Sequence, residues 1–215
     1  MKNLVAVIAA RGGSKRVKNK NIRKFGKNNL LERKLVQLKK IKDIDEIVVN
    51  SDSDKILDLA KKYKVRRVKR LKKFASNSVS INDVYVNVTE KIESKNILFI
   101  HITSPFVKTE SLEKAIKTYK NLKKNYDSLA SVTYFKKFLW HDNKSINYNP
   151  NKMPRSQDLP NYYYLNFAFN ILPKKVLLSQ RNIIGKSIYP FELSEIESFD
   201  IDTMEEFKIA EKLIE

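Results

Sequence analysis

The chain has 215 residues, of which 42% are hydrophobic, and this composition suits one α/β domain with a buried core. It has no cysteine, which excludes disulfides and cysteine chemistry. No apolar run approaches the roughly 20 residues that span a bilayer, and Met1-Lys2-Asn3 leads directly into an expected strand. We therefore expect no signal peptide and a cytoplasmic protein without a membrane partner. The net charge of +19 is compatible with a nucleic-acid partner. However, the lysines, among them Lys34, Lys39 and Lys61, are dispersed over expected helices without interleaved aromatic residues. We therefore expect these lysines to lie on solvated helix faces, and we expect no nucleic-acid partner.

Apolar runs rich in β-branched residues alternate with helical patterns along the first half of the chain. This alternation predicts βαβ units around a mostly parallel sheet. Leu31, Leu35 and Leu38 recur at helical spacing and indicate one of the helices. The elements expected here are a strand at 3–9, a helix at 30–41, a strand at 46–50, a helix that ends near 63, an edge strand at 65–68 and a helix near 80–93.

The second half continues the alternation and then departs from it. A strand at 96–101 precedes a helix at 109–123 and a strand at 128–135. The stretch 136–164 is rich in proline, asparagine and aromatic residues and ends in Tyr162-Tyr163-Tyr164. We interpret it as an excursion from the sheet, a β-hairpin with a long loop. A strand at 166–172, a strand formed by Phe199–Asp202 and a helix at 204–214 complete a single domain over residues 1–215.

The loop after the first strand reads Ala-Arg-Gly-Gly-Ser-Lys-Arg from Ala10 to Arg16. Two of the four glycines of the chain, Gly12 and Gly13, lie here, and glycine permits positive φ and close approach of a ligand. The loop matches neither a Walker A motif nor a dinucleotide fingerprint, and a tight turn alone would also explain a glycine pair. Successive backbone N–H groups and added cations nevertheless indicate a polyphosphate site. The polar residues that support this hypothesis are Arg11, Ser14, Lys15, Arg16, Lys20 and Asn21.

Two carboxylates, Asp200 and Asp202, flank Ile201 near the end of the chain. Carboxylates at i and i+2 on a strand point to the same face. Two such anions favour a cation beside them, and Mg²⁺ prefers oxygen ligands together with substrate phosphates. Alternatively, Asp202 caps the helix that starts at Thr203. The phosphate loop upstream favours the metal.

Thr103-Ser104-Pro105 ends the most apolar strand. Ligands of open α/β sheets sit outside the carboxyl ends of the strands, which predicts Ser104 near the ligand. A simple strand stop made by Pro105 explains the same pattern. His101, just before it, is compatible with a ligand contact or with a satisfied interior histidine.

Taken together, these segments resemble those of the acylneuraminate cytidylyltransferases, the CMP-sialic acid synthetases. The segments occur in the order of that family and span nearly the whole chain. The matching segments are Ala10–Arg16 with Lys20-Asn21, Ser51-Asp52, Thr103-Ser104-Pro105, Arg155–Pro160 and Asp200-Ile201-Asp202.

The resemblance implies a Rossmann-like, three-layer nucleotide-diphospho-sugar transferase fold and transfer of CMP from CTP to the anomeric hydroxyl of a 2-keto-3-deoxy sugar acid, with release of pyrophosphate. It implies Mg²⁺ as cofactor, held by Asp200 and Asp202, and catalytic roles for Arg11, Lys20 and Asp202. It also implies a homodimer in which 136–164 is the dimerisation segment. The substrate-binding residues expected are Gly12, Gly13, Ser14, Lys15, Asn21, Arg70, Ser80, His101, Ser104, Arg155 and Gln157.

The chain departs from the family pattern on the sugar side. His101 stands where the family usually has glutamine, Ala75–Ser78 (including Asn77) replaces a stretch with an Asp-Thr pair, and Phe167 replaces the glycine of an Asn-Gly pair. These changes indicate a different nonulosonic or related acid.

Three alternatives stay open at this point. One is a cytidylyltransferase for 3-deoxy-octulosonate or another sugar nucleotidyltransferase of the same fold. Another is a basic nucleic-acid-binding module, although paired aspartates would repel a phosphate backbone. The third is a catalytically silent homologue.

Overall fold

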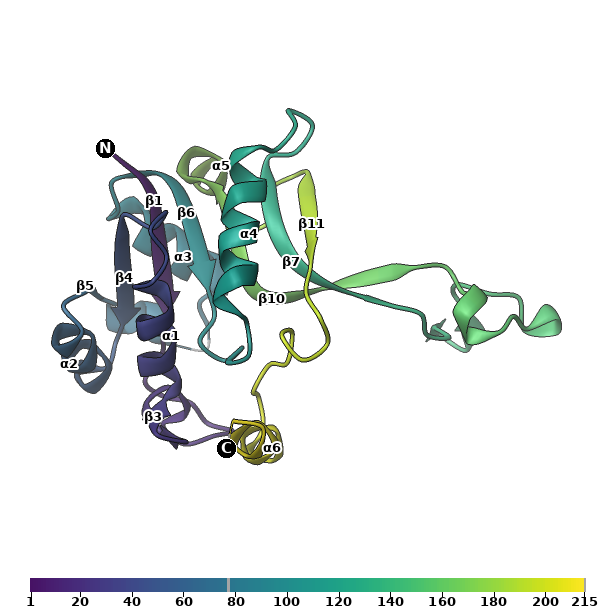
Figure 1. Ribbon diagram of the computed structural model, residues 1–215, viewed down its shortest axis with the longest axis horizontal. Helices are drawn as coiled ribbons and strands as arrows, with labels where there is room; N and C mark the ends of the chain where they lie inside the picture. The colour runs from purple at the N-terminus through teal and green to yellow at the C-terminus, as the bar shows by residue number, and fades with distance from the viewer. Residues whose placement is uncertain (77, 215) are drawn as a thin grey trace.

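The computed structural model describes residues 1–76 and 78–214, and within them a central sheet carries the fold (Figure 1). Its order is β11-β7-β10-β6-β1-β4-β5, and neighbours are parallel except where β10 pairs antiparallel with β6 and β7. The expected mostly parallel α/β fold is therefore confirmed. The strands are β1 (Lys2–Ala9), β4 (Glu46–Ser51), β5 (Arg66–Lys69), β6 (Ser94–Ile100), β7 (Ser128–Phe135), β10 (Tyr162–Pro173) and β11 (Ile188–Glu192).

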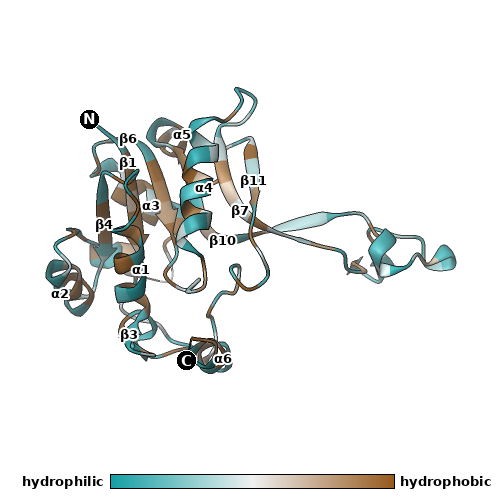
Figure 2. Cartoon of the chain, viewed as in Figure 1, coloured by the Kyte–Doolittle hydropathy of each residue, from teal (hydrophilic) through white to brown (hydrophobic). Residues whose placement is uncertain are grey.

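Helices cover both faces of the sheet, which makes three layers. Successive side chains of a strand point to opposite faces, so Leu4 and Ile8 of β1 join one core cluster and Val5 and Val7 the other. On the first face pack α1 (Leu30–Leu38), α2 (Asp54–Lys62) and α4 (Thr109–Lys120), and on the second α3 (Ile81–Glu90) and α5 (Lys174–Gln180). Figure 2 shows the apolar strands between these layers.

Beyond the carboxyl ends of the parallel strands lies α6 (Met204–Lys212), which packs away from the sheet (Figure 1). Its Phe207 meets the Phe25 ring edge-on, with 5.3 Å between centroids, in a small separate core that also holds Val17 and Ile201. The small hairpin of β2 (Lys24–Phe25) and β3 (Asn28–Asn29) supplies Phe25. This core anchors the end of the chain next to the loop that follows β1.

The stretch predicted as an excursion is a long arm that projects from the body (Figure 1). β7 and β10 continue past the other strands as a two-stranded ribbon, with Phe135 opposite Tyr162. The tip holds β8 (Trp140–His141), β9 (Lys144–Ser145) and the short 3-10 helices Pro150–Lys152 and Ser156–Asp158. The three tyrosines 162–164 belong to β10, so the prediction that this strand begins at 166 is wrong: the ribbon pairing extends it.

Two elements were missed, and one expected strand is not formed. α5 and β11 are absent from the predicted elements, because their apolar patterns are short. Phe199–Asp202 is not a strand, since it pairs with no neighbouring strand beyond one bond from the Ile201 N–H to the Thr103 carbonyl oxygen (2.9 Å). Ile201 is nevertheless fully buried while Asp200 is exposed and Asp202 partly exposed, so the expected alternation of the two carboxylates persists.

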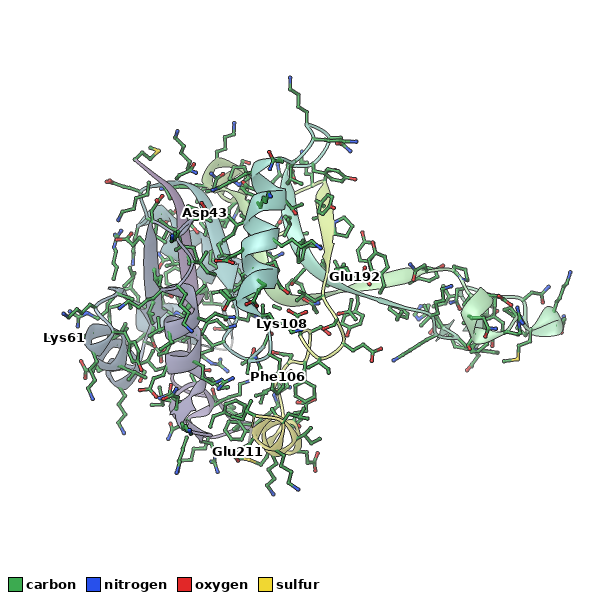
Figure 3. All side chains as sticks on the ribbon, viewed as in Figure 1. Asp43, Lys61, Phe106, Lys108, Glu192 and Glu211 are labelled. Carbon is green, nitrogen blue, oxygen red and sulfur yellow. The ribbon has the colours of Figure 1, made fainter. Side chains whose placement is uncertain are left out.

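Charge is spread over the whole outline of the molecule, with basic side chains such as Lys61 pointing outward (Figure 3). Lys34 is the exception among the lysines expected on solvated faces: it is 2% exposed. Its ammonium donates to Gln37 Oε1 (2.8 Å) and to the Ser104 carbonyl oxygen (3.2 Å). Burial, reinforced by the nearby Arg33 charge, lowers the pKa of Lys34 to about 7. Of the helices in the described residues, none combines the length and the hydropathy that a membrane crossing requires.

Candidate active site

The site forms where the parallel strands β1, β4, β5 and β6 end. Because parallel strands present their carboxyl ends at one edge, the loops after them meet there. These loops carry Gly12, Asp52, Arg70 and His101, and the segment before α6 adds Asp200. The convergence expected from the sequence is therefore a property of the fold.

The glycine loop is held against the loop after β4. The Gly12 N–H donates to Asp52 Oδ1 (3.0 Å), and a Cβ added at Gly12 would lie 2.7 Å from the Cβ of Ser53. Neither Gly12 nor Gly13 has a positive φ, so the expectation that the pair supplies left-handed backbone is wrong. Close packing explains Gly12 instead. A Cβ at Gly13 would meet nothing within 4 Å, so this position faces open space.

Cationic residues of the same loop line a small cavity. Arg11, Gly13, Lys15 and Asp52 enclose about 180 Å³ together with residues 75 and 76. Asn21 is 7% exposed and donates from Nδ2 to the Arg11 carbonyl oxygen (2.9 Å). The Asn21 side chain therefore stabilises the backbone of the loop at Arg11. The cavity has the charge and the size to bind part of a phosphate chain.

Asp202 lies against this loop although about 180 residues separate them. Its Oδ1 accepts from Arg16 Nη2 (2.8 Å) and lies 3.4 Å from Lys20 Nζ, which also donates to the Ile201 carbonyl oxygen. The alternative in which Asp202 caps α6 is wrong: Thr203 is the cap, and it exchanges hydrogen bonds with Glu206. The carboxylate of Asp202 is thus directed to the cationic residues that follow the glycine pair.

Magnesium fits this arrangement on chemical grounds. Nowhere in residues 1–76 and 78–214 do three or more His, Cys, Asp or Glu side chains cluster as a ready-made metal site. Mg²⁺ does not need such a cage, since it binds through one or two carboxylates plus substrate phosphates. Asp200 and Asp202, next to a cationic loop, are such a donor set, and the metal stays a prediction.

Two hydrogen-bonded pairs of buried and partly buried polar groups lie near the carboxyl ends of the strands. Arg70 is 4% exposed and donates from Nε to Asn50 Oδ1 (2.8 Å). Burial lowers the pKa of Arg70; the Asp52 carboxylate opposes this shift. Tyr85 shares a hydrogen bond between its hydroxyl and His101 Nε2 (3.0 Å).

The same environment sets the protonation of the Tyr85–His101 pair. Burial raises the pKa of Tyr85 to about 12. Burial also lowers the pKa of His101, a shift that the Asp200 carboxylate opposes and the Lys20 ammonium reinforces. Burial of His101 therefore favours its neutral imidazole form, and this residue lines the next pocket.

That pocket is larger, about 720 Å³, and mostly apolar. It combines apolar walls with a few polar groups, as small-molecule sites do. His101 and Asp200 line it, as expected. Its other principal lining residues, which sequence reasoning did not assign to a site, are Ile81, Tyr85, Tyr164, Asn166, Phe167, Ile184 and Phe199. Among these residues, only Phe167 was indicated by the sequence, because it departs from the family pattern.

Two other expected binding residues, Ser80 and Ser104, differ in their surroundings. Ser80 is the N-cap of α3 and accepts from the Asp83 N–H (3.1 Å). Ser104 is 1% exposed, so its hydroxyl does not reach a ligand in this conformation. Its expected place near the ligand stays a prediction: among the described residues the buried Ser104 Oγ has no hydrogen-bond partner, and only its carbonyl oxygen accepts, from Lys34. Asn77 lies outside the described residues.

Arg155 and Gln157 lie on the arm, away from the body that holds the two pockets (Figure 1). Arg155 forms an ion pair with Asp158 (Nε to Oδ2, 2.8 Å), and the Gln157 carbonyl oxygen accepts from Lys136 Nζ (2.6 Å). Within one chain, the structure does not bring these two residues to the site.

Comparison with known proteins decides the family. The model of the family described as Cytidylyltransferase matches residues 5–215. The chain belongs to the cytidylyltransferase family. This membership makes it a nucleotidyltransferase, and it confirms the resemblance drawn from the glycine loop and the Asp-Ile-Asp segment.

Individual relatives cover the chain almost end to end. It is 28% identical to the post-translational flagellin modification protein B of Campylobacter coli (100% of this chain, 96% of the relative). It is also 28% identical to the CMP-N,N'-diacetyllegionaminic acid synthase of Legionella pneumophila (99% and 96%). A solved CMP:2-keto-3-deoxy-manno-octonic acid synthetase complexed with CTP has the same fold, with a TM-score of 0.74 at 14% identity (99% and 98%).

Proposed function

We propose that this cytidylyltransferase transfers CMP from CTP to the anomeric hydroxyl of a 2-keto-3-deoxy sugar acid of the nonulosonate type. The observation that carries the proposal is the contact of Arg16 and Lys20 with Asp202, since it joins a cationic loop to a carboxylate at one site. The likeness to a CMP-N,N'-diacetyllegionaminic acid synthase supports the sugar class.

The reaction needs no protein nucleophile. The anomeric oxygen attacks the α-phosphorus of CTP, a new P–O bond forms, the bond to the β-phosphate bridging oxygen breaks, and pyrophosphate leaves with its electron pair while the hydroxyl proton passes to solvent. Negative charge grows on the phosphoryl oxygens and the leaving group. Arg11, Lys15 and Lys20 stabilise this charge from the loop after β1.

Asp200 and Asp202 would hold Mg²⁺, which when bound neutralises phosphate charge and lowers the pKa of the attacking hydroxyl. Without the ion, Asp202 keeps Arg16 and Lys20 oriented toward the site through the ion pairs described above. His101 and its partner Tyr85 offer hydrogen bonds in the larger pocket. They can therefore orient a sugar hydroxyl or carboxylate.

We further propose a homodimer in which the arm of one copy reaches the site of the other. Trp140 and the tyrosines 162–164 are exposed on the arm, and aromatic residues are enriched at protein interfaces. Arg155 could then pair with the sugar carboxylate of the partner's site. This arrangement explains why Arg155 and Gln157 lie far from the pockets of their own chain. The cytoplasmic location stays a prediction.

A pyrophosphate-release assay tests the activity. The protein is incubated with Mg²⁺, each of the four nucleoside triphosphates, and N,N'-diacetyllegionaminic acid, N-acetylneuraminic acid or 2-keto-3-deoxy-manno-octonic acid. We expect release with CTP and an N-acylated nonulosonic acid. Release with the octonic acid alone would favour the octulosonate alternative. Tight, steeply salt-dependent binding of single-stranded RNA without release would support a nucleic-acid module.

Mixing two inactive variants tests the dimer. Arg155→Ala removes the arginine that the arm would contribute to the partner's site. Asp202→Asn removes the carboxylate that the body contributes to its own site. If the arm completes the partner's site, a mixed dimer has one intact site, and random pairing restores about a quarter of the wild-type activity. An inactive mixture that forms dimers, or a monomer by light scattering, would contradict the arrangement.

A further inference from the structure

Phe167 has an unusual backbone conformation at the edge of the large pocket. Its φ is 54°, in the left-handed region, where bulky side chains are rare. The other such non-glycine residues in the described chain are Asn19, Lys64, Asp142, Asn143 and Arg181, which are polar and lie in turns or at helix ends. Phe167 alone in this set is aromatic and lies inside a strand, β10.

A dense set of hydrogen bonds holds this conformation. Asn166 Oδ1 accepts from Ser131 Oγ (2.6 Å) and from the Ala168 N–H (3.1 Å), and Asn166 Nδ2 donates to Thr133 Oγ1 (2.9 Å). The pairing of β10 with β7 changes register here, between Leu165 and Asn170. Side chains of β7 therefore stabilise this bulge in β10. Backbone strain that surrounding contacts maintain is a feature of ligand sites.

The bulge presents the Phe167 ring to the pocket. The residue is 38% exposed and lines the same cavity as His101 and Asp200. Ile81, which is 57% exposed, and Phe199 add to the apolar lining of this pocket. The Asn166 carboxamide oxygen already accepts two hydrogen bonds, so it is poorly placed to receive a third from a ligand hydroxyl.

We propose that Phe167 is a specificity-determining residue of the sugar-acid site, and that its ring selects acids carrying N-acetyl groups over acids whose only substituents are hydroxyls. The inference rests on the proposed function and names the substrate class more narrowly. An acetamido methyl group gains apolar contact with the ring, whereas a hydroxyl placed there loses water without gaining a partner.

Phe167→Gly tests the proposal, with Lys64→Gly as the matched control. Both substitutions put glycine at a left-handed position (φ 54° and 53°), but Lys64 is exposed at the end of α2, outside the lining of the pocket. Both variants should fold, because glycine readily adopts this conformation. The readout is the ratio of kcat/KM for N,N'-diacetyllegionaminic acid to that for 2-keto-3-deoxy-manno-octonic acid, at saturating CTP.

We expect Phe167→Gly to lower this ratio about tenfold or more, with the KM for CTP unchanged, and Lys64→Gly to leave it at the wild-type value. Phe167→Leu, which keeps an apolar side chain, should retain most of the preference. An unchanged ratio in a folded Phe167→Gly would overturn the inference alone. A wild-type protein that transfers CMP to neither acid would overturn the proposed function, and this inference with it.

Discussion

Replacing each glycine of the loop by alanine separates packing from ligand binding. A Cβ at Gly12 would lie 2.7 Å from the Cβ of Ser53, an atom next to the backbone, so the loops after β1 and β4 must move apart. Overpacking of this kind costs about 1–3 kcal/mol. For a chain of this size, that lowers the melting temperature by about 2–12 °C. The Gly12 N–H bond to Asp52 would lengthen as well.

Gly13→Ala is the contrasting change. Nothing lies within 4 Å of the added Cβ and φ is not left-handed, so the folded state accepts the methyl group. The less flexible unfolded chain then stabilises the protein by about 0.4–1 kcal/mol. The methyl group, however, enters the open space beside Arg11 and Lys15, where we place the triphosphate. We expect CTP affinity to fall at least about tenfold, because backbone approach to the phosphates is blocked.

Thermal unfolding of the ligand-free variants and calorimetric titration with CTP measure the two effects separately. A Gly13→Ala variant that binds CTP as tightly as the wild type would refute the assignment of the loop as the triphosphate site. A Gly12→Ala variant with an unchanged melting temperature would refute the steric argument for Gly12. The structure specifically predicts that Gly12→Ala lowers the melting temperature and that Gly13→Ala raises it.

Three further predictions follow from other parts of the site and core. Asp202→Asn should reduce Mg²⁺-dependent turnover at least about 100-fold, yet change stability by less than about 1 kcal/mol, because its ion pair with Arg16 is exposed and its contact with the partly buried Lys20 is long (3.4 Å); near wild-type turnover would refute its role. Between the folded pKa of Lys34, about 7, and its ordinary value of 10.5, the unfolded chain binds more protons than the folded one, so stability should rise with pH in this window. Urea unfolding at pH 7, 8 and 9 should show this rise flattened in Lys34→Met, and equal slopes would contradict the buried ammonium. Tyr85→Phe leaves His101 Nε2 without its partner and should cost about 1–3 kcal/mol in unfolding experiments; no loss would mean that the bond is not formed in solution.

The sequence predicts the core elements well because burial on both faces of a parallel sheet leaves continuous apolar strands. β1, β4 and β6 lie within two residues of the ranges expected from such runs. Elements without this signal were missed: α5 has seven residues, and β11 includes Pro190. The pairing of Tyr162 with Phe135 depends on a partner strand 27 residues away, which no local pattern reveals.

The sequence by itself determined the alternation of strands and helices, the cationic glycine loop and the acidic pair near the end, since composition and spacing encode them locally. Tertiary structure alone decided which groups meet. It placed Asp202 against Arg16 and Lys20, and it buried Lys34 and Ser104. It also gave Phe167, inside β10, a left-handed backbone conformation, because the side chains of β7 hold Asn166 in place. These outcomes depend on contacts between residues distant in the chain, and such contacts leave no periodic trace in the sequence.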